Sequence, residues 1–547
     1  MASVIGKRQN GRTYYYLAES ARVNGQPRIV SQRYLGSAED IAAALAGEGG
    51  VPARSRHLAF GEVAAVWATL ERLKVAELVD RIAGTRSAKV PIGTYVAVAV
   101  LHRITGPGVE WGQWWASTAA PRFVRPRLPA STWDSVRLWQ RLDRLTVGQL
   151  EQIEAGLCAT VREISGAGPA LAVDVPSFAT FVASVDPLAA GRSDATLAGL
   201  GLVVTGDGAI PLVSRAYRRD VPVVASFGVL AEQLGARHHR LTGADDVTLV
   251  FDTGQHSQLN LASGPHFVGA LPPGDHPELL SRPATARRTV DPHRFPGLTA
   301  LDTRATVFGV GRRVILTHSA TLHAAQARGL AQALSTATRQ LDGLAAGLAA
   351  GTYRQSRDEV LSEVARITRA SRIDRVLSTR LTGTPPSGMR LEWRVDEGAR
   401  ARLAQEVFGK QLLVTDHDDW SVADVVTAYR ARYHLDSTFR QLSEPYVAGP
   451  AAGGSRWYWT DHRIAVYGLV CVIAATVTHL MRREADRAGL DLSVRELLEH
   501  LSGIQETMLR YPSTGGRPRT RRVLTDRDPH QQRLFDLFGL LSYEPKG

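Results

Sequence analysis

Two aspartates stand where a carboxylate is costly unless something pairs with it. Asp174 lies within the apolar run ALAVDVPSF, and Asp252 ends the apolar run VTLVF. A carboxylate in or at the edge of a buried strand needs a partner, and a divalent cation is one such partner. Each residue alone also suits an ordinary role, as a turn or capping acid at a strand end. The pair therefore indicates a candidate metal site.

A third acid, Asp436, lies in the segment AYRARYHLDSTFRQLSEP, where the pattern predicts a long helix from about Ser421 to Leu442. At about 100° per residue, positions four and seven apart share one face of a helix. An acid flanked by arginines on one face could complete a metal site while the arginines hold phosphates. The same pattern also describes a surface ladder of Arg–Asp pairs. The stripe consists of Tyr429, Arg432, Asp436, Arg440 and Ser443.

The composition excludes some classes of protein. Two cysteines, Cys158 and Cys471, exclude a disulfide scaffold and a cysteine-based zinc module in this chain of 547 residues. The net charge of +12 suggests a polyanionic partner, although a GC-rich genome would produce the same arginine bias. We expect no secretory signal. The apolar stretch Ile464–Met481 contains polar residues, so we interpret it as a buried core helix and expect no membrane partner.

The pattern along the chain predicts a mixed α/β protein of several parts. β-rich runs broken at Asn-Gly pairs predict an N-terminal β-hairpin unit, 1–37, and helical periodicity predicts a helical domain, 38–165. Strand-like runs predict the first part of an α/β core, 166–274. Residues 275–405 differ in composition and are interpreted as an insertion, after which the core resumes in 406–490 and a basic tail follows in 491–547.

Several residues outside the acids are candidates for contact with nucleic acid. Lys7 and Arg12 alternate with tyrosines in the N-terminal unit, a pattern that can grip a DNA backbone or form a solvated sheet face. Arg137 and Arg141 lie on a short predicted helix of either a helix-turn-helix-like reader or an ordinary packing domain. Trp393, in LEWRV, could stack on an unpaired base or pack in a core.

The histidines predict no zinc site, because their spacing fits no tight ligand set and cysteine partners are absent. Two residues shortly after Asp252, His256 and Asn260, could line the same pocket as that acid. The histidines considered are His238, His239, His256, His266, His276 and His293.

Three acids in the order strand, strand, helix resemble the DDE transposases of bacterial insertion sequences. The helix resembles the Y-x2-R-x3-E-x6-K motif of their IS-four group, with Asp436 in place of the Glu and Ser443 in place of the Lys. GRTYYYLAESARVNGQPRIVSQRYLG resembles the N-terminal opening of one branch of these enzymes. LVFDTGQHSQLN is similar to the segment around their second Asp, and WYWTDHRIAVYGLVCVIAATVTHLMRR to the helix after their third acid. The likeness spans most of the chain, but 275–405 matches only by position.

The resemblance implies an RNase H-like catalytic core, a mixed sheet with flanking helices, interrupted by an inserted domain. Asp174 would lie on the first strand, Asp252 on the fourth and Asp436 on the following helix, and together they would hold two Mg²⁺ or Mn²⁺ ions. The stripe residues and the two N-terminal units would contact DNA. The implied function is binding of terminal inverted repeats, followed by cleavage and strand transfer into target DNA. A homodimer is expected, since two ends must meet, and the expected location is the bacterial cytoplasm, at the nucleoid.

Two other functions stay open. One is a catalytically weakened or inactive DNA-binding protein derived from a transposase, since two motif positions differ. The other is an actin-like or sugar-kinase-type ATPase, because DTGQHS at 252–257 resembles a D-x-G-x-x-S phosphate loop. We find no second, paired phosphate loop in the sequence that would complete such a site.

Overall fold

The computed structural model divides into two compact units and has a mixed α/β fold, as predicted. One unit comprises Met1–Ala65, Gln113–Ala130 and Leu498–Gly547, and the other comprises Val66–Gly112 and Ser131–Leu497. The structure describes residues 2–9, 12–23, 26–38, 41, 52–85, 90–127, 132–133, 135–166, 169–175, 198–218, 223–244, 247–252, 265–307, 309–351, 356–369, 372–384, 388–442, 461–511 and 520–545.

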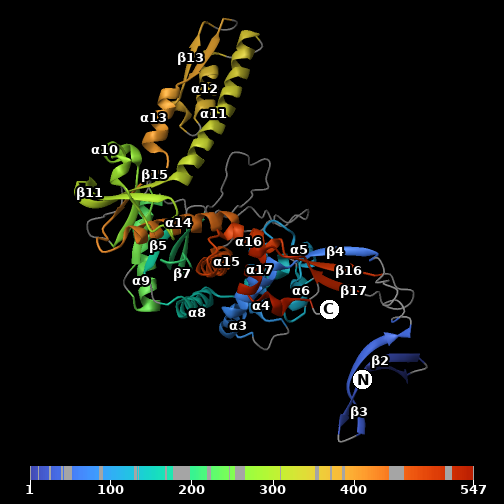
Figure 1. Ribbon diagram of the computed structural model, residues 1–547. Coiled ribbons are helices and arrows are strands. Elements are labelled where there is room, and N and C mark those ends of the chain that lie inside the picture. Colours follow the sequence, from blue (N-terminus) through green and yellow to red (C-terminus); the bar gives the residue numbers. More distant parts are fainter. Residues whose placement is uncertain are drawn as a thin grey trace. The chain divides into compact units, whose positions relative to one another are not determined.

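The second unit is built around a nine-stranded mixed sheet, with strand order β10-β11-β12-β15-β9-β8-β5-β6-β7 (Figure 1). The strands β5, β6 and β7 pair antiparallel, and the helix α9 follows them in the chain. Strand β8 then pairs in parallel with β5, and β9 pairs in parallel with β8. The bounds of these elements are β5 (Ala170–Val175), β6 (Ala198–Thr205), β7 (Pro211–Arg218), α9 (Val223–Thr242), β8 (Val247–Phe251) and β9 (Phe267–Leu271).

The two parallel strands are buried on both faces, which explains their sequences. Every residue of β8 (VTLVF) and β9 (FVGAL) is buried, so both strands read as continuous apolar runs and not as alternating ones. Gly269 is required where the strands meet, because a Cβ at this position would lie 2.1 Å from the ring of Phe251. Close packing at the centre of the sheet fixes the strand end that carries Asp252.

The range 275–405 contributes to the main sheet as well as to a separate arm. Strands β10, β11 and β12 extend the sheet, and β15 returns between β12 and β9, antiparallel to both. The arm projects from the sheet and consists of three helices and a two-stranded sheet (Figure 1). The bounds are β10 (Arg288–Thr289), β11 (Leu298–Val307), β12 (Val310–Ser319), α11 (Ala320–Ala349), α12 (Arg357–Thr368), β13 (Leu377–Thr382), β14 (Arg390–Val395), α13 (Glu397–Val407) and β15 (Lys410–Thr415).

The arm has a hydrophobic core of its own. The 30-residue helix α11 is capped by Ser319, whose side chain accepts a hydrogen bond from the Leu322 backbone N–H. Buried residues recur every three or four positions along α11 and face α12 and the β13–β14 hairpin. They are Leu330, Leu334, Ala337, Leu341, Leu344 and Leu348.

Two long helices complete this unit. Helix α14 (Val422–Leu442) packs against β5, β8 and β9, and α15 (Asp461–Arg487) packs against α14, α4, α8 and β7. Within α15, Ala465–Arg487 is long and apolar enough to span a membrane by length and composition, and 83% of its most apolar window is buried inside the protein. Further helices are α3 (Val75–Ala83), α4 (Ile92–Thr105), α7 (Ser135–Leu142), α8 (Val147–Ser165) and the short α10 (Pro277–Leu280).

The first unit combines residues from both ends of the chain. Strands β1 (Ala2–Gln9), β2 (Arg12–Val23) and β3 (Gln26–Ser37) form an antiparallel sheet. A second sheet joins β4 (Arg54–Ala59) to β16 (Gln505–Arg510), which pairs in turn with β17 (Thr520–Leu524). The helices α6 (Ala120–Phe123) and α17 (Pro529–Leu537) belong to this unit, whereas α2 (Gly61–Arg72), α5 (Trp111–Ser117) and α16 (Val494–Ser502) cross the boundary between the two units.

Candidate active site

Asp252 lies directly after β8 and meets two residues of helix α14. Its Oδ2 is 2.9 Å from Nη1 of Arg432, and its Oδ1 accepts a hydrogen bond of 3.3 Å from the hydroxyl of Tyr429. The side chain of Asp252 is 38% exposed and that of Arg432 is 13% exposed. The carboxylate is therefore held at a fixed orientation by both partners and still faces solvent.

Two tyrosines on this face of α14 form hydrogen bonds next to Asp252. Tyr429 is buried, and burial raises the pKa of its phenol above the ordinary value, with Tyr433 and Asp252 adding to the effect. The Tyr433 hydroxyl lies 3.5 Å from that of Tyr429 and accepts a hydrogen bond from Gln411 of β15. Tyr433 was not predicted as a site residue, although it lies four residues after Tyr429 and so about 40° around the helix.

The other two acids lie on elements adjacent to Asp252. Strands β5 and β8 are parallel neighbours with Val173 opposite Val250, so Asp174 and Asp252 both come at the carboxyl ends of their strands. Asp174 is described through its backbone only. Asp436 is half-buried and lies one turn beyond Arg432 on α14, about 6 Å along the helix axis. The three acids thus lie on β5, directly after β8 and on α14, and α14 packs against both strands.

The remaining predicted residues divide into those the structure describes and those it does not. Ser443, His256 and Asn260 lie outside the described residues, and so do the side chains of Arg12 and Arg440. Lys7 is exposed on β1, where its Nζ donates to Gln32 and lies 5.0 Å from the ring centroid of Tyr16. Arg137 and Arg141 are exposed on α7.

Trp393 lies on β14 and packs onto the arm. Its ring is half-buried against the core of the arm, and its indole Nε1–H donates a hydrogen bond of 3.1 Å to Asp342 of α11. These contacts are those expected of a packing residue.

The donor set of the three acids is suited to a hard divalent cation. Carboxylate oxygens are the ligands that Mg²⁺ and Mn²⁺ prefer. An ionised carboxylate has about four lone-pair sites, so Asp252 can accept from Arg432 and Tyr429 and still coordinate an ion. The residues present therefore fit the divalent ions that the sequence predicts.

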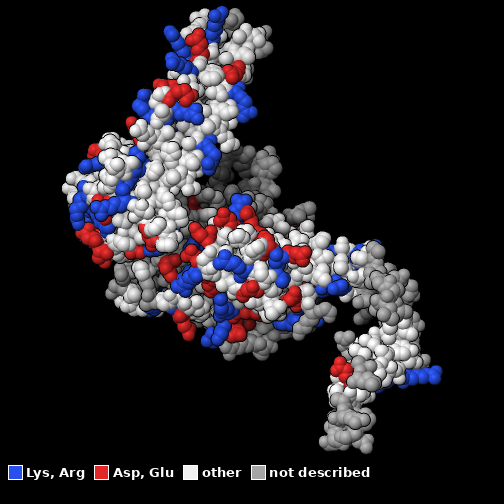
Figure 2. Space-filling model, viewed as in Figure 1, with Lys and Arg blue, Asp and Glu red and all other residues white. Residues whose placement is uncertain are grey.

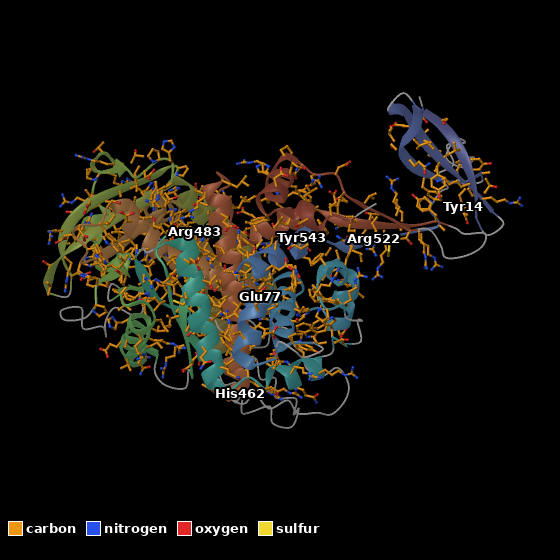
Figure 3. The ribbon with its side chains drawn as sticks, turned by 90° about the horizontal axis from the view of Figure 1, so that it is seen from below. Tyr14, Glu77, His462, Arg483, Arg522 and Tyr543 are labelled. Carbon is orange, nitrogen blue, oxygen red and sulfur yellow. The ribbon has the colours of Figure 1, made fainter. Side chains whose placement is uncertain are left out.

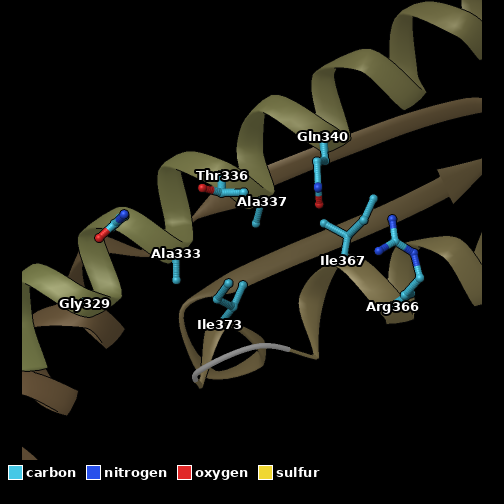
Figure 4. A pocket seen from close by; sticks show the side chains of 9 residues that line it. Gly329, Ala333, Thr336, Ala337, Gln340, Arg366, Ile367 and Ile373 are labelled. Atoms are coloured by element: carbon cyan, nitrogen blue, oxygen red, sulfur yellow. The ribbon is translucent and has the colours of Figure 1, made fainter. Parts of the chain in front are cut away.

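A surface cavity of about 380 Å³ lies elsewhere, on the arm between α11 and α12 (Figure 4). Its lining is mostly small or apolar, and Arg366 at its edge pairs with Glu363 at 2.6 Å. Basic and acidic side chains are interspersed on the face of the arm shown in Figure 2.

Comparisons with known proteins give little further guidance. No protein-family model matches the chain, and the search of curated proteins finds no match. Among solved structures, a piggyBac transposase in a synaptic complex with hairpin DNA is 9% identical over 81% of this chain and 78% of that one, with a TM-score of 0.29. A TM-score of this size does not define a common fold, so the candidate site depends on its own geometry.

Proposed function

We propose that the protein is a transposase of an insertion sequence, which cleaves DNA at the ends of its element and joins those ends to target DNA. The observation that carries the proposal is the contact of Asp252 with Tyr429 and Arg432. Asp252, the second predicted acid, precedes Tyr429 by 177 residues and Arg432 by 180 residues, and yet its side chain contacts both.

The topology around these residues supports an RNase H-like core. An antiparallel meander of three strands, a helix and two parallel strands give the order β7-β6-β5-β8-β9, with Asp174 on the first strand and Asp252 after the fourth in chain order. Those are the positions that the resemblance assigns to the first two acids. Helix α14, which carries Asp436, packs against β5, β8 and β9.

The chain's own residues would perform defined tasks in this reaction. Asp174, Asp252 and Asp436 would hold two Mg²⁺ or Mn²⁺ ions, and Arg432 and Tyr429 would keep the Asp252 carboxylate in the orientation seen here. When bound, such ions stabilise the attacking and leaving oxygens of an in-line phosphoryl displacement. The exposed cations Lys7, Arg137 and Arg141 would contact phosphates. The partners would be terminal inverted repeats, target DNA and a second copy of the chain, in the bacterial cytoplasm.

Cleavage of DNA carrying the element's own ends tests the proposal. We expect the purified chain to cut at those ends in the presence of Mg²⁺ or Mn²⁺ and to stop when the ions are chelated, because the ions would stabilise the attacking and leaving oxygens. Binding should weaken steeply with salt if arginines contact phosphates. Salt-sensitive binding of the ends without cutting under either metal would instead identify a DNA-binding protein that has lost catalysis.

Replacing Arg432 by glutamine is expected to lower the cleavage rate by about 10- to 100-fold, since a charge-assisted hydrogen bond contributes about 1.5–3 kcal/mol. The Asp252 carboxylate would lose the partner that orients it at 2.9 Å. Single-turnover cleavage rates at saturating DNA measure the effect. The matched control is Arg304→Gln, which removes an exposed arginine 2.7 Å from Asp418. Equal rates for wild type and Arg432→Gln would contradict the orienting role.

A further inference from the structure

A second group of side chains that can act as metal ligands lies at the opposite end of the central strands from Asp252. His266 comes just before β9, and Asp416 and His417 come just after β15, its antiparallel neighbour. Asp252 follows the end of β8, which runs parallel to β9, so the two groups are at different ends of the strands. The ligand atoms of His266, Asp416 and His417 all lie within 4.8 Å of one another.

Neighbouring groups already orient two of these side chains. The Phe267 backbone N–H donates to Oδ1 of Asp416 at 2.8 Å, which leaves Oδ2 directed at His266. Nε2 of His417 is 2.8 Å from the hydroxyl of Thr248 on β8, and the His417 ring stacks on Trp420 at 3.8 Å. Partners of this kind fix the orientation and tautomer of metal ligands.

The spacing and the exposure of the group suit a small metal ion. Bonds of about 2.0–2.2 Å in a tetrahedral zinc site place ligand atoms about 3.3–3.5 Å apart. Nδ1 of His266 is 3.1 Å from Oδ2 of Asp416. The His266 ring now stacks on His417 at 4.6 Å, but its side chain is 59% exposed and can turn toward a shared ion. Asp419 lies 3.8 Å from Nδ1 of His417 and is available as a fourth ligand.

The charges around the group also favour a cation. Asp419 lies two residues after His417, whereas Asp418 is paired with Arg304 at 2.7 Å. The nearby guanidinium of Arg313 is paired with Asp302 at 2.7 Å and donates to the backbone oxygens of His417 and Trp420. This arginine therefore leaves the carboxylate of Asp416 available.

We propose that His266, Asp416 and His417 bind one divalent transition-metal ion of the zinc class. Mixed imidazole and carboxylate ligands select such ions over Mg²⁺. The ion would join β9 to β15, the two strands on either side of residues 272–409, immediately before α14 begins at Val422. Its role would be structural, and the proposal stands independently of the DNA-cleaving function.

Titration of the full chain with Zn²⁺ and Co²⁺ in excess Mg²⁺ tests this site. We expect one Zn²⁺ per chain by calorimetry, and a visible Co²⁺ spectrum of a four-coordinate site. His266→Ala and Asp416→Asn should each weaken binding about 100-fold. The matched control is His276→Ala, which removes a histidine 3.2 Å from Glu278. A second control, Asp252→Asn, tests whether the titrated Zn²⁺ binds at the acidic site instead. Both control variants should bind Zn²⁺ as tightly as the wild-type chain.

The folding of each variant is checked by circular dichroism. His266 is exposed, and asparagine at position 416 still offers an oxygen to the Phe267 N–H, so both variants should fold. Failure of the wild-type chain to bind Zn²⁺ would overturn the proposal. Unchanged binding in a folded His266→Ala chain would overturn it equally.

Discussion

Replacing Asp252 by asparagine is expected to reduce the rate of DNA cleavage at least about 1000-fold while DNA binding stays unchanged. The substitution removes a negative charge from the group that would hold the catalytic ions, and metal ions contribute several kcal/mol to such reactions. Asparagine is nearly the same size and still offers an oxygen to Tyr429. Single-turnover cleavage and equilibrium DNA binding, measured on the same preparation, separate the two effects.

A matched control comes from another Asp–Arg pair. Asp418 is 2.7 Å from Arg304, and both side chains are more than 60% exposed. Asp418→Asn should therefore cut DNA at the wild-type rate, since it lies outside the proposed site. Asp174→Asn and Asp436→Asn should behave like Asp252→Asn. If all three single variants cut normally, the three acids do not form the catalytic site, whatever else the protein does with DNA.

Local sequence patterns predicted the elements that carry the site. The continuous apolar run VTLVF predicted a buried strand, and β8 is that strand. The helix predicted from about Ser421 to Leu442 is α14, Val422–Leu442. In both cases the periodicity of nearby residues reports burial, and burial determines the element. Such local patterns did not predict that the three acids share one site; that prediction came from the resemblance alone.

The sequence did not indicate which distant strands pair with one another. Within the predicted insertion, 275–405, β11 and β12 join the main sheet, and β15, which follows that range, inserts between β12 and β9. Strands far apart in the sequence carry no local signal of which partner they pair with, so the order of the strands could not be predicted. For the same reason, the spacing of the histidines suggested no metal site. His266 meets Asp416 only because β9 and β15 pair across 150 residues.

The sheet of β4, β16 and β17 contains a buried acid whose burial the sequence pattern does not predict. Glu506 on β16 is fully buried, and both Arg122 of α6 and Arg522 of β17 pair with it. Arg122 also donates to the backbone oxygen of Tyr543, and Figure 3 labels Tyr543 and Arg522. One carboxylate thus pairs with two cations and links a helix and two strands. Buried charges of this kind are tolerated only when paired.

Glu506→Ala is expected to destabilise this sheet by about 2–4 kcal/mol, because two arginines lose their partner and a cavity replaces the side chain. The lower part of the range applies if solvent reaches the arginines, whose side chains are 23% and 34% exposed. Hydrogen exchange of β4 and β16 amides, followed by mass spectrometry, measures local opening. These amides should exchange about 30- to 1000-fold faster.

The control for Glu506→Ala is Asp526→Asn, at an exposed acid just beyond β17, which should change the local stability by less than about 0.5 kcal/mol. Glu506→Gln separates charge from shape, since it keeps the volume of the side chain and loses the ion pairs. We expect its effect to lie between those of the other two variants. Exchange at the wild-type rate in Glu506→Ala would show that the ion pairs of Glu506 do not stabilise β16 within this sheet.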